Sequence, residues 1–441
     1  MSNPASAPPL RIAVVGGGIA GLTMALALLK HKQQGANIQL DLYEQAPQFA
    51  EIGAGVAFGP NAQRALRMMG VGDTLDAVAG PAGDDANLWF DFKVGDEGEN
   101  SGKHFATVTG HNAARGSVHR ADFLDELIKR LPSEHAHFNH HAVSYTPHSS
   151  GVTIHFDKEN KEEKVEADVL IDSSGIKSAL RRHLYERKGE EVEKQKARYS
   201  EWIAWRGLIP REKYEEVFRK GANDKVMHCG KGRHILTFPV REGKPVNIVG
   251  FVRDEDHKKL GDHDGPWSES RPKEELLEDF SQFNEDCKEL LGEIEDPSIW
   301  GIFALPPIEH VTDDRVVLIG DSAHATTPHQ GAGAGQAVED SLFLSTLLCH
   351  PILLTSPPHS RPRILSHALS IYATERHPRA QKVQTTSDEA GRLYEFLGEK
   401  EGGDLEKIRE NLEGRMGWIW EEDLEKEVER VGRMMEEFSK E

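Results

Sequence analysis

Apolar and polar positions at the start of the chain predict a strand, a tight turn, a helix and a second strand. Leu10–Val15 is apolar and rich in β-branched residues, and Leu22–Leu29 follows a group of glycines with helix-forming residues. Ile38–Tyr43 alternates apolar and polar positions, which is typical of a strand. Ile12–Leu29 carries no charge, but its four glycines favour a strand, turn and helix over a membrane span.

The pattern changes twice along the rest of the chain. Helices are predicted at Ala62–Met69 and Asp122–Leu131, and strands at Gly151–Phe156 and Lys164–Asp172 around a solvated loop, Asp157–Glu163. Short β-type runs then predict a mainly antiparallel sheet; they are Trp202–Ile209, His234–Val240 and Val246–Val252. We then expect a helix at Lys273–Leu291, a buried strand at Arg315–Ile319 and another helix at Gly335–Leu348. Residues 351–362 should form a proline-rich irregular loop, and the last sixty residues should form a charged helical tail.

The return of the opening pattern near residue 315 predicts an α/β fold in which one domain interrupts another. We expect a discontinuous nucleotide-binding domain of residues 1–80, 111–190 and 301–370. A β-rich substrate domain of residues 81–110 and 191–300 would be inserted into it, and residues 371–441 would form C-terminal helices.

Charge and cysteine content narrow the possible functions. The chain has 53 Lys and Arg against 73 Asp and Glu, a net charge of −20, which argues against nucleic acid and anionic membranes as partners. A small anion remains possible, because one buried arginine can outweigh a distant negative surface. The three cysteines are far apart and the first nine residues do not resemble a secretory signal, so a reducing, cytoplasmic location is expected. No metal site is expected, since a solvated loop accounts for His137, His140 and His141.

The glycines after the first strand predict a dinucleotide site. Residues 16–21, Gly-Gly-Gly-Ile-Ala-Gly, fit G-x-G-x-x-G between a strand and a helix. Gly16 would allow the turn, Gly18 would let a pyrophosphate approach, and Gly21 would let the helix pack closely. Glu44 lies 23 residues after Gly21, where a carboxylate can bind ribose hydroxyls and would repel a 2′-phosphate. FAD or NAD is therefore favoured over NADP.

A second glycine-rich turn lies about 300 residues later. The strand at Arg315–Ile319 ends in Gly320-Asp321, and Gly331 and Gly333 lead into the next helix. A carboxylate at a strand end, here Asp321, can bind ribityl hydroxyls, and a helix start can face the flavin edge where negative charge develops. Taken together, the two turns predict one FAD held at both ends, whereas the second turn alone would be equally consistent with a tight helix entry.

These motifs resemble the class A flavoprotein aromatic hydroxylases, whose fold is of the para-hydroxybenzoate hydroxylase type, and the salicylate hydroxylase group in particular. The matching stretches cover nearly the whole chain; they are 51–62, 117–124, 205–207, 234–241, 315–340 and 418–424. One position departs from the family pattern, which has Asp-Gly-Ile-x-Ser-x-x-Arg where this chain has Ser174-Gly175-Ile176-Lys177-Ser178-Ala179-Leu180-Arg181. We interpret Ser174 as a tolerated change; weaker FAD retention or slower flavin reduction is the alternative.

The resemblance implies a monooxygenase with bound FAD that uses NADH and O₂ as co-substrates. A flavin C4a-hydroperoxide would attack an electron-rich phenolic ring, and with salicylate the carboxyl group would leave as CO₂ to give catechol. The partner would be a small aromatic acid, and the protein a monomer or homodimer. Two other possibilities stay open: another aromatic acid of the anthranilate, hydroxynicotinate or resorcylate type, or a flavin-binding module without turnover.

Candidate site residues follow from position and chemistry. His329, in the second turn, is suited to deprotonating the phenol, although it could instead cap the helix. Arg206, in an apolar run, would bind the substrate carboxylate or an internal acid. His234 and Phe238 share one side of a strand and would line the pocket or pack the sheet.

Two more residues complete the candidate site. Trp89 could form an aromatic wall of the substrate pocket, with burial in the core as the alternative. Arg120 matches a family arginine near the flavin, with a surface position at a helix start as the alternative.

Overall fold

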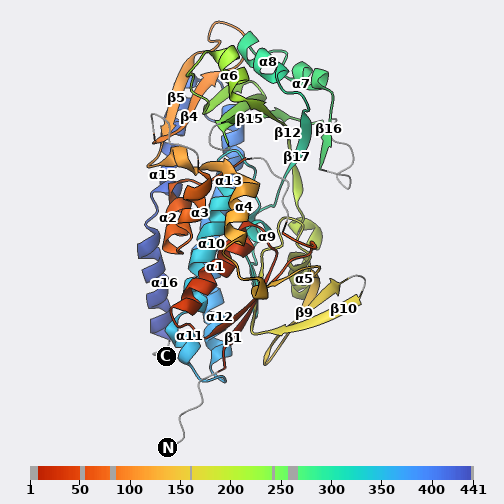
Figure 1. Cartoon of the computed structure of the whole chain (residues 1–441), viewed down its shortest axis with the longest axis vertical. Helices are drawn as coiled ribbons and strands as arrows, with labels where there is room; N and C mark the ends of the chain where they lie inside the picture. The colour runs from red at the N-terminus through yellow and green to blue at the C-terminus, as the bar shows by residue number, and fades with distance from the viewer. Residues whose placement is uncertain are drawn as a thin grey trace, which may run out of the picture.

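The computed structural model describes residues 8–49, 55–79, 86–158, 161–240, 244–256 and 267–438. Parts of two stretches that carry the family resemblance, residues 51–54 and residue 241, lie outside these ranges. The described chain is elongated, with one large sheet in the lower half of Figure 1 and another in the upper half.

The lower sheet has six strands and is mostly parallel. Its order is β18 (Thr312–Asp313), β19 (Val316–Leu318), β11 (Val169–Asp172), β1 (Leu10–Val15), β2 (Ile38–Tyr43) and β7 (Ala136–His137), with only β18 antiparallel to its neighbour. The central strands β11 and β19 are buried along their whole length. Such apolar strands form where both faces of a parallel sheet are covered, so their carboxyl ends make a rigid edge for a binding site.

Two long helices follow the two predicted glycine-rich turns; the first packs on this sheet and the second packs on the first. They are α1 (Ile19–Gln33) and α10 (Gly333–Leu348), and the hydroxyls of Thr23 and Ser341 lie 3.0 Å apart where the helices cross. Helices α2 (Pro60–Met68) and α16 (Leu424–Phe438) pack against α10. Ten buried residues in α1 explain why this uncharged segment is not a membrane span.

The upper sheet has eight strands and is antiparallel except where β13 pairs with β4. Its order is β16 (Ser268–Ser270), β17 (Ser298–Ala304), β12 (Arg198–Pro210), β15 (Pro245–Arg253), β14 (Arg233–Pro239), β13 (Val226–Gly230), β4 (Leu88–Val94) and β5 (His104–Thr109). Residues from 88–109 therefore join the same sheet as residues from 198–304.

The two faces of the upper sheet have different neighbours. Alternate residues such as Ile203 and Trp205 pack in one core with α6 (Arg211–Phe218), α7 (Lys273–Asp279) and α8 (Glu285–Gly292), seen at the top of Figure 1. The opposite face carries Trp202 and Ala204, and it is turned toward the second glycine-rich turn. Because strand residues alternate between faces, β12 contributes to both the core and the site.

Smaller elements complete the fold. A three-stranded sheet, β10 (Lys161–Ala167), β9 (Gly151–Lys158) and β8 (His141–His148), contacts β11 and α5 (Ala179–Lys188), and β3 (Gly55–Ala57) pairs with β6 (Ser117–His119). The other helices are α3 (Gly72–Val78), α4 (Arg120–Ile128), α9 (Asp321–His324), α11 (Pro351–Thr355), α12 (Arg361–Ile371), α13 (His377–Tyr394), α14 (Leu405–Arg415) and α15 (Gly417–Trp420).

Several predicted elements were too long. Lys164–Asp172 is two strands, because Asp168 leaves the small sheet and binds Arg11 before β11 begins. Lys273–Leu291 is two helices, because Asn284 caps a new helix by accepting a hydrogen bond from the backbone N–H of Cys287. The charged tail forms four helices, with breaks such as 395–404 between them.

The predicted irregular loop at 351–362 was confirmed only for residues 356–360, which lie between two helices. Pro351 and Pro362 each lie in the first turn of a helix, α11 and α12. Proline is well tolerated there, because the first N–H groups of a helix have no partner inside the helix. None of the helices in the described ranges is long and apolar enough to cross a bilayer.

Candidate functional site

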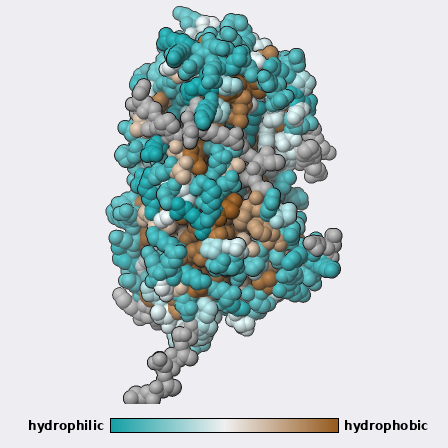
Figure 2. Space-filling model, viewed as in Figure 1, coloured by the Kyte–Doolittle hydropathy of each residue, from teal (hydrophilic) through white to brown (hydrophobic). Residues whose placement is uncertain are grey.

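One cavity of about 820 Å³ lies at the carboxyl ends of β1, β2 and β11. Its wall includes residues of both glycine-rich turns, among them Gly16, Gly18, Asp321 and Ala334. In open α/β sheets ligands bind beyond the carboxyl ends of the strands, and cofactor sites commonly have volumes in this range. Figure 2 shows hydrophobic side chains gathered toward the lower half of an otherwise mostly hydrophilic face.

The first turn has the shape that a pyrophosphate requires. Gly16 has a φ of +104°, and a Cβ atom on Gly21 would lie 1.8 Å from the carbonyl oxygen of Gly16. A Cβ atom on Gly18 would have no protein atom within 4 Å, so this glycine faces open space. The backbone is thus closely packed at Gly16 and Gly21 and open at Gly18, as the sequence predicts for close approach of a dinucleotide.

Glu44 lies at the end of β2 and lines the same cavity. Its carboxylate accepts hydrogen bonds from the backbone N–H groups of Gly17 (2.7 Å) and Ala46 (2.8 Å). These bonds fix its direction and leave carboxylate lone pairs for a ribose hydroxyl.

The second turn also contributes residues to the wall of this cavity. Asp321 is exposed in the cavity wall, directly after Gly320, and Arg120 also lines the cavity from the start of α4. Gly331 has a φ of +59°, and a Cβ atom there would lie 3.3 Å from both Ala57 and the Trp89 ring. Gly333 begins α10, and Ala334 follows it into the cavity wall.

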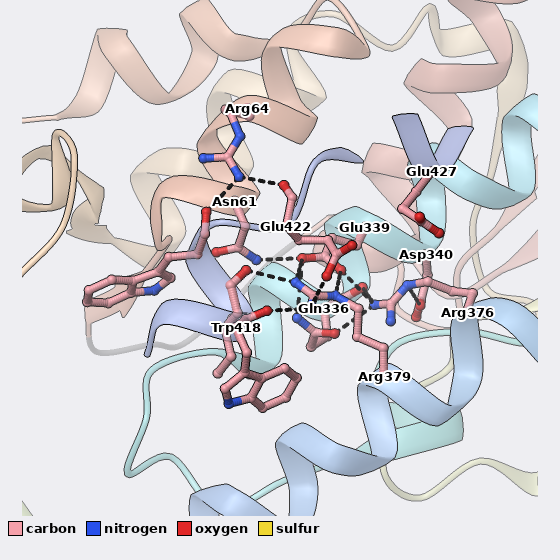
Figure 3. A network of polar contacts seen from close by, with 12 residues as sticks. Asn61, Arg64, Gln336, Glu339, Asp340, Arg376, Arg379, Trp418, Glu422 and Glu427 are labelled. Atoms are coloured by element: carbon pink, nitrogen blue, oxygen red, sulfur yellow. Dashed lines mark hydrogen bonds and ion pairs between the residues drawn. The ribbon is translucent and has the colours of Figure 1, made fainter. Parts of the chain in front are cut away.

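A buried ionic network, unpredicted from sequence, lies behind the second turn; Figure 3 shows the part of it around Glu339, Asp340 and Arg376. Asp340 of α10 accepts a hydrogen bond from the backbone N–H of Gly320 (2.8 Å) and contacts His324 at 2.6 Å and Arg376 at 3.0 Å. Burial alone would raise the pKa of Asp340, but Arg376 and His324 outweigh it and hold the pKa below its usual value. Because buried charges are stable only when paired, these contacts fix the strand end that presents Asp321.

The same network ties α10 to the C-terminal helices. Glu339 has no exposed surface and pairs with Arg376 and Arg379, while Asn61 of α2 donates a hydrogen bond to it at 2.5 Å. Arg379 also donates to the backbone carbonyl of Trp418 at 2.8 Å. The C-terminal segments that carry Arg376, Arg379 and Trp418 are therefore part of the scaffold of the site.

Ser174, the departure from the family pattern, lies in the cavity wall but is already engaged. Its backbone N–H and its hydroxyl both donate to one carboxylate oxygen of Asp172, at 2.9 and 2.6 Å, and Ser178 donates to the other at 2.5 Å. Burial raises the pKa of Asp172, and these hydrogen bonds and Arg181 oppose the shift. The carboxylate of this segment therefore belongs to Asp172 and lies behind the cavity wall. It is two residues earlier in the chain than the aspartate of the family pattern.

His329 lies in a cluster of buried rings. Its ring centroid is 4.7 Å from Trp202, 4.9 Å from Phe251 and 5.3 Å from His234. Neither ring nitrogen of His329 has a hydrogen-bond partner within the described part of the chain. Burial lowers the pKa of His329 well below its usual value, so the imidazole is neutral and resists protonation unless a nearby anion stabilises the cation.

The other predicted substrate residues surround the same region. His234 stacks on Phe251 with centroids 4.6 Å apart, and Phe238 shares an apolar cluster with Trp89 and Ala332. Trp89 also meets Trp420 edge to face at 5.4 Å. The structure thus brings His329, His234, Phe238 and Trp89 to the second turn, and Trp89 is at the same time a core residue.

Arg206 is on the same face of the upper sheet but contacts a different ring. Its guanidinium lies over Trp300 at 4.6 Å, and its Nε is buried without a hydrogen-bond partner among the described residues. Burial, with a smaller contribution from Arg120, lowers the pKa of Arg206 to about 10. A largely buried cation beside a second arginine is suited to an anionic ligand.

Sequence reasoning missed Glu395, Trp202 and Phe251. Trp202 and Phe251 fall inside predicted strands, so strand parity could have placed them beside His234. Glu395 lies 161 residues beyond His234, in the tail that the sequence suggests is solvated, and no local pattern marks it.

Comparisons of sequence and of structure with known proteins identify the same class of protein. The family model described as "FAD binding domain" matches residues 10–387. Salicylate hydroxylase of Pseudomonas putida is 37% identical, covering 96% of this chain and 94% of that protein, and 6-methylsalicylate 1-monooxygenase of Aspergillus terreus is 37% identical, covering 94% and 90%. A solved salicylate hydroxylase substrate complex matches with a TM-score of 0.83 and 36% identity, covering 96% of this chain and 98% of that one.

Proposed function

This chain belongs to the FAD-binding-domain family of flavoprotein monooxygenases, and from that premise we propose that it converts salicylate, or a closely related phenolic aromatic acid, to a catechol with loss of CO₂. NADH and O₂ are the co-substrates in this proposal. The proposed location of the protein is the reducing cytoplasm, where the three buried, unpaired cysteines would persist. Residues 1–80, 111–190 and 301–370 form the FAD-binding domain, residues 81–110 and 191–300 the substrate domain, and residues 371–441 the C-terminal helices.

The observation that carries the proposal is the single cavity shared by the two turns. FAD fits it: Gly16–Gly21 and Glu44 would hold the adenosine half, and Asp321 with the start of α10 would hold the flavin half. When bound and reduced, FAD supplies the activated oxygen for the ring. Both relatives named above act on salicylates, which supports the same substrate class here.

The chain's own residues then have three tasks. The buried rings of Trp202, Phe251 and Phe238 exclude water from the ring to be hydroxylated. His329 takes the phenol proton, which raises the electron density of the substrate ring. Arg206 holds the carboxylate and so orients the carbon that bears it.

The test is turnover of the purified, FAD-loaded protein with salicylate and NADH in air. Catechol and CO₂ should appear in amounts equal to the NADH consumed, with little hydrogen peroxide. NADH oxidation that no phenolic acid accelerates would reject the hydroxylase and favour a flavin-binding module. Hydroxylation of another aromatic acid without loss of CO₂ would keep the class of enzyme and reject salicylate.

Replacing Arg206 by Ala should weaken binding of the substrate carboxylate. A charge-assisted hydrogen bond is worth about 1.5–3 kcal/mol, so KM for salicylate should rise about 10- to 100-fold. KM for phenol, which lacks the carboxylate, should change much less. Arg198→Ala, at an exposed position of the same strand, is the control; equal changes for both substrates would assign Arg206 a structural role.

A further inference from the structure

A carboxyl group that the proposed reaction does not use lies behind His329. Glu395 follows α13 directly and has no exposed surface. Its Oε1 accepts a hydrogen bond from the indole N–H of Trp202 at 2.8 Å and lies 3.0 Å from Nδ1 of His234. Its Oε2 is buried without a hydrogen-bond partner in the ranges that the structure covers.

The contacts of Glu395 limit where the protons of this group can lie. An indole N–H can only donate, so Oε1 of Glu395 is an acceptor toward Trp202. When Glu395 is ionised it can only accept, which places the hydrogen of His234 on Nδ1. Nε2 of His234 is then an unprotonated nitrogen, and it too is buried without a partner among the described residues.

Besides Glu395, the titratable groups beside His234 include His329, Tyr394 and Cys229. Burial raises the pKa of Tyr394 and Cys229 above their usual values, so both stay neutral and His329 is the neighbour suited to exchange a proton. The two imidazole centroids lie 5.3 Å apart, and Phe251 packs against both rings. A Cβ atom on Gly391 of α13 would lie 2.6 Å from the His329 ring, so the helix that leads to Glu395 also closes directly on His329. At this separation one water or a small ring rotation can connect the two imidazoles.

Burial makes a cation at either histidine unfavourable unless Glu395 is ionised. Burial lowers the pKa of both His234 and His329, and Arg253 of β15 lowers that of His329 further. Burial raises the pKa of Glu395 to about 8, although the hydrogen bond from Trp202 and the positive charges of three arginines oppose it. Those arginines are Arg253, Arg392 of α13 and Arg233 of β14.

We propose that His234 and Glu395 form a proton-holding pair that receives, through His329, the proton of the substrate phenol. The proposal rests on the hydroxylase function proposed above and assigns Glu395 as a positioning residue. The phenol O–H bond breaks as an N–H bond forms on His329; that N–H bond then breaks as one forms at Nε2 of His234. Ionised Glu395 stabilises the resulting imidazolium through Nδ1–H, and the proton returns by the reverse path when the products leave.

The direction of the pH dependence follows from the raised pKa of Glu395. Below about pH 8 the folded protein holds Glu395 protonated, and the pair has no anion to stabilise a cation. Above that pH the carboxylate is ionised and the pair accepts a proton. Hydroxylation should therefore rise with pH up to about 8.

The test compares the FAD-loaded wild type with Glu395→Gln, whose amide oxygen can still accept from Trp202 and His234. The variant should lose the rising limb of the pH profile, and single-turnover hydroxylation should fall about tenfold at high pH, whereas FAD affinity and flavin reduction by NADH should not change. Glu395→Asp should restore part of the limb. Glu399→Gln, at an exposed position four residues on, is the control and should behave as the wild type.

A second readout does not depend on turnover. The infrared carbonyl band of a protonated carboxylic acid should disappear from the wild type across about pH 8 and should be missing from Glu395→Gln. An active wild type whose pH profile and infrared titration are unchanged in Glu395→Gln would overturn the proton path alone. A wild type that hydroxylates no phenolic acid would overturn the proposed function and the path with it.

Discussion

Hydroxylation by a His329→Gln enzyme is expected to fall about 100- to 10,000-fold, because general base catalysis by a positioned side chain typically contributes that much. His329 is neutral and buried, and its two ring nitrogens have no hydrogen-bond partner in the described chain, so one of them offers a free lone pair to the phenol proton. Glutamine fills a similar volume but cannot take that proton at neutral pH. FAD binding should be retained, since His329 is not part of the wall of the large cavity.

Rapid mixing of the reduced, substrate-bound variant with O₂ measures this step separately from flavin reduction. His228→Gln is the matched control: His228 is also buried, but it stacks on Phe218 of α6 on the other face of the upper sheet. Turnover of His329→Gln at the wild-type rate would show that another group takes the phenol proton.

Gly18→Val is expected to weaken FAD binding about 100-fold without destabilising the apoprotein. A side chain at Gly18 meets no protein atom within 4 Å, and the backbone there is extended (φ −78°, ψ −169°), a conformation that valine adopts readily. The side chain would instead occupy the space of the pyrophosphate. Steric conflict of this kind costs about 1–3 kcal/mol, and each 1.4 kcal/mol is a factor of ten in affinity.

Two other glycine variants serve as comparisons for Gly18→Val. Gly414→Ala in α14 also meets nothing within 4 Å and lies outside the cavity wall, so FAD affinity and stability should both persist. Gly21→Ala places its Cβ atom against the carbonyl of Gly16 and should destabilise the apoprotein itself. FAD titration by fluorescence and thermal unfolding of the apoprotein measure the two effects. Full FAD affinity in Gly18→Val would mean that the pyrophosphate does not pass the first turn.

Local patterns predicted the parts of the site that lie close together in sequence. A strand, glycines and a helix over 10–33 form one βα unit, and its turn geometry follows from a motif of six consecutive residues, 16–21. Glu44 could be placed because β2 follows β1 directly and in parallel. The second turn, from Gly320 to α10, was recognisable for the same reason.

Contacts between distant segments could not be predicted. Glu395 reaches His234 only because α13 packs beside the upper sheet, and Asp340 reaches Arg376 across the interior of the lower half. Element lengths were misjudged where one polar side chain, such as Asp168 or Asn284, ends one element and begins the next. In each case the deciding hydrogen bond depends on the folded arrangement rather than on the local hydrophobic pattern.

The most direct measurement is a crystal structure of the protein with FAD bound. The adenosine half should lie along Gly16–Gly21 with its ribose at Glu44, and the flavin ring should lie between Asp321 and the start of α10, with one edge toward His329. A flavin that touches only one of the two turns, or a ring that lies away from His329, would contradict the hydroxylase assignment of this site.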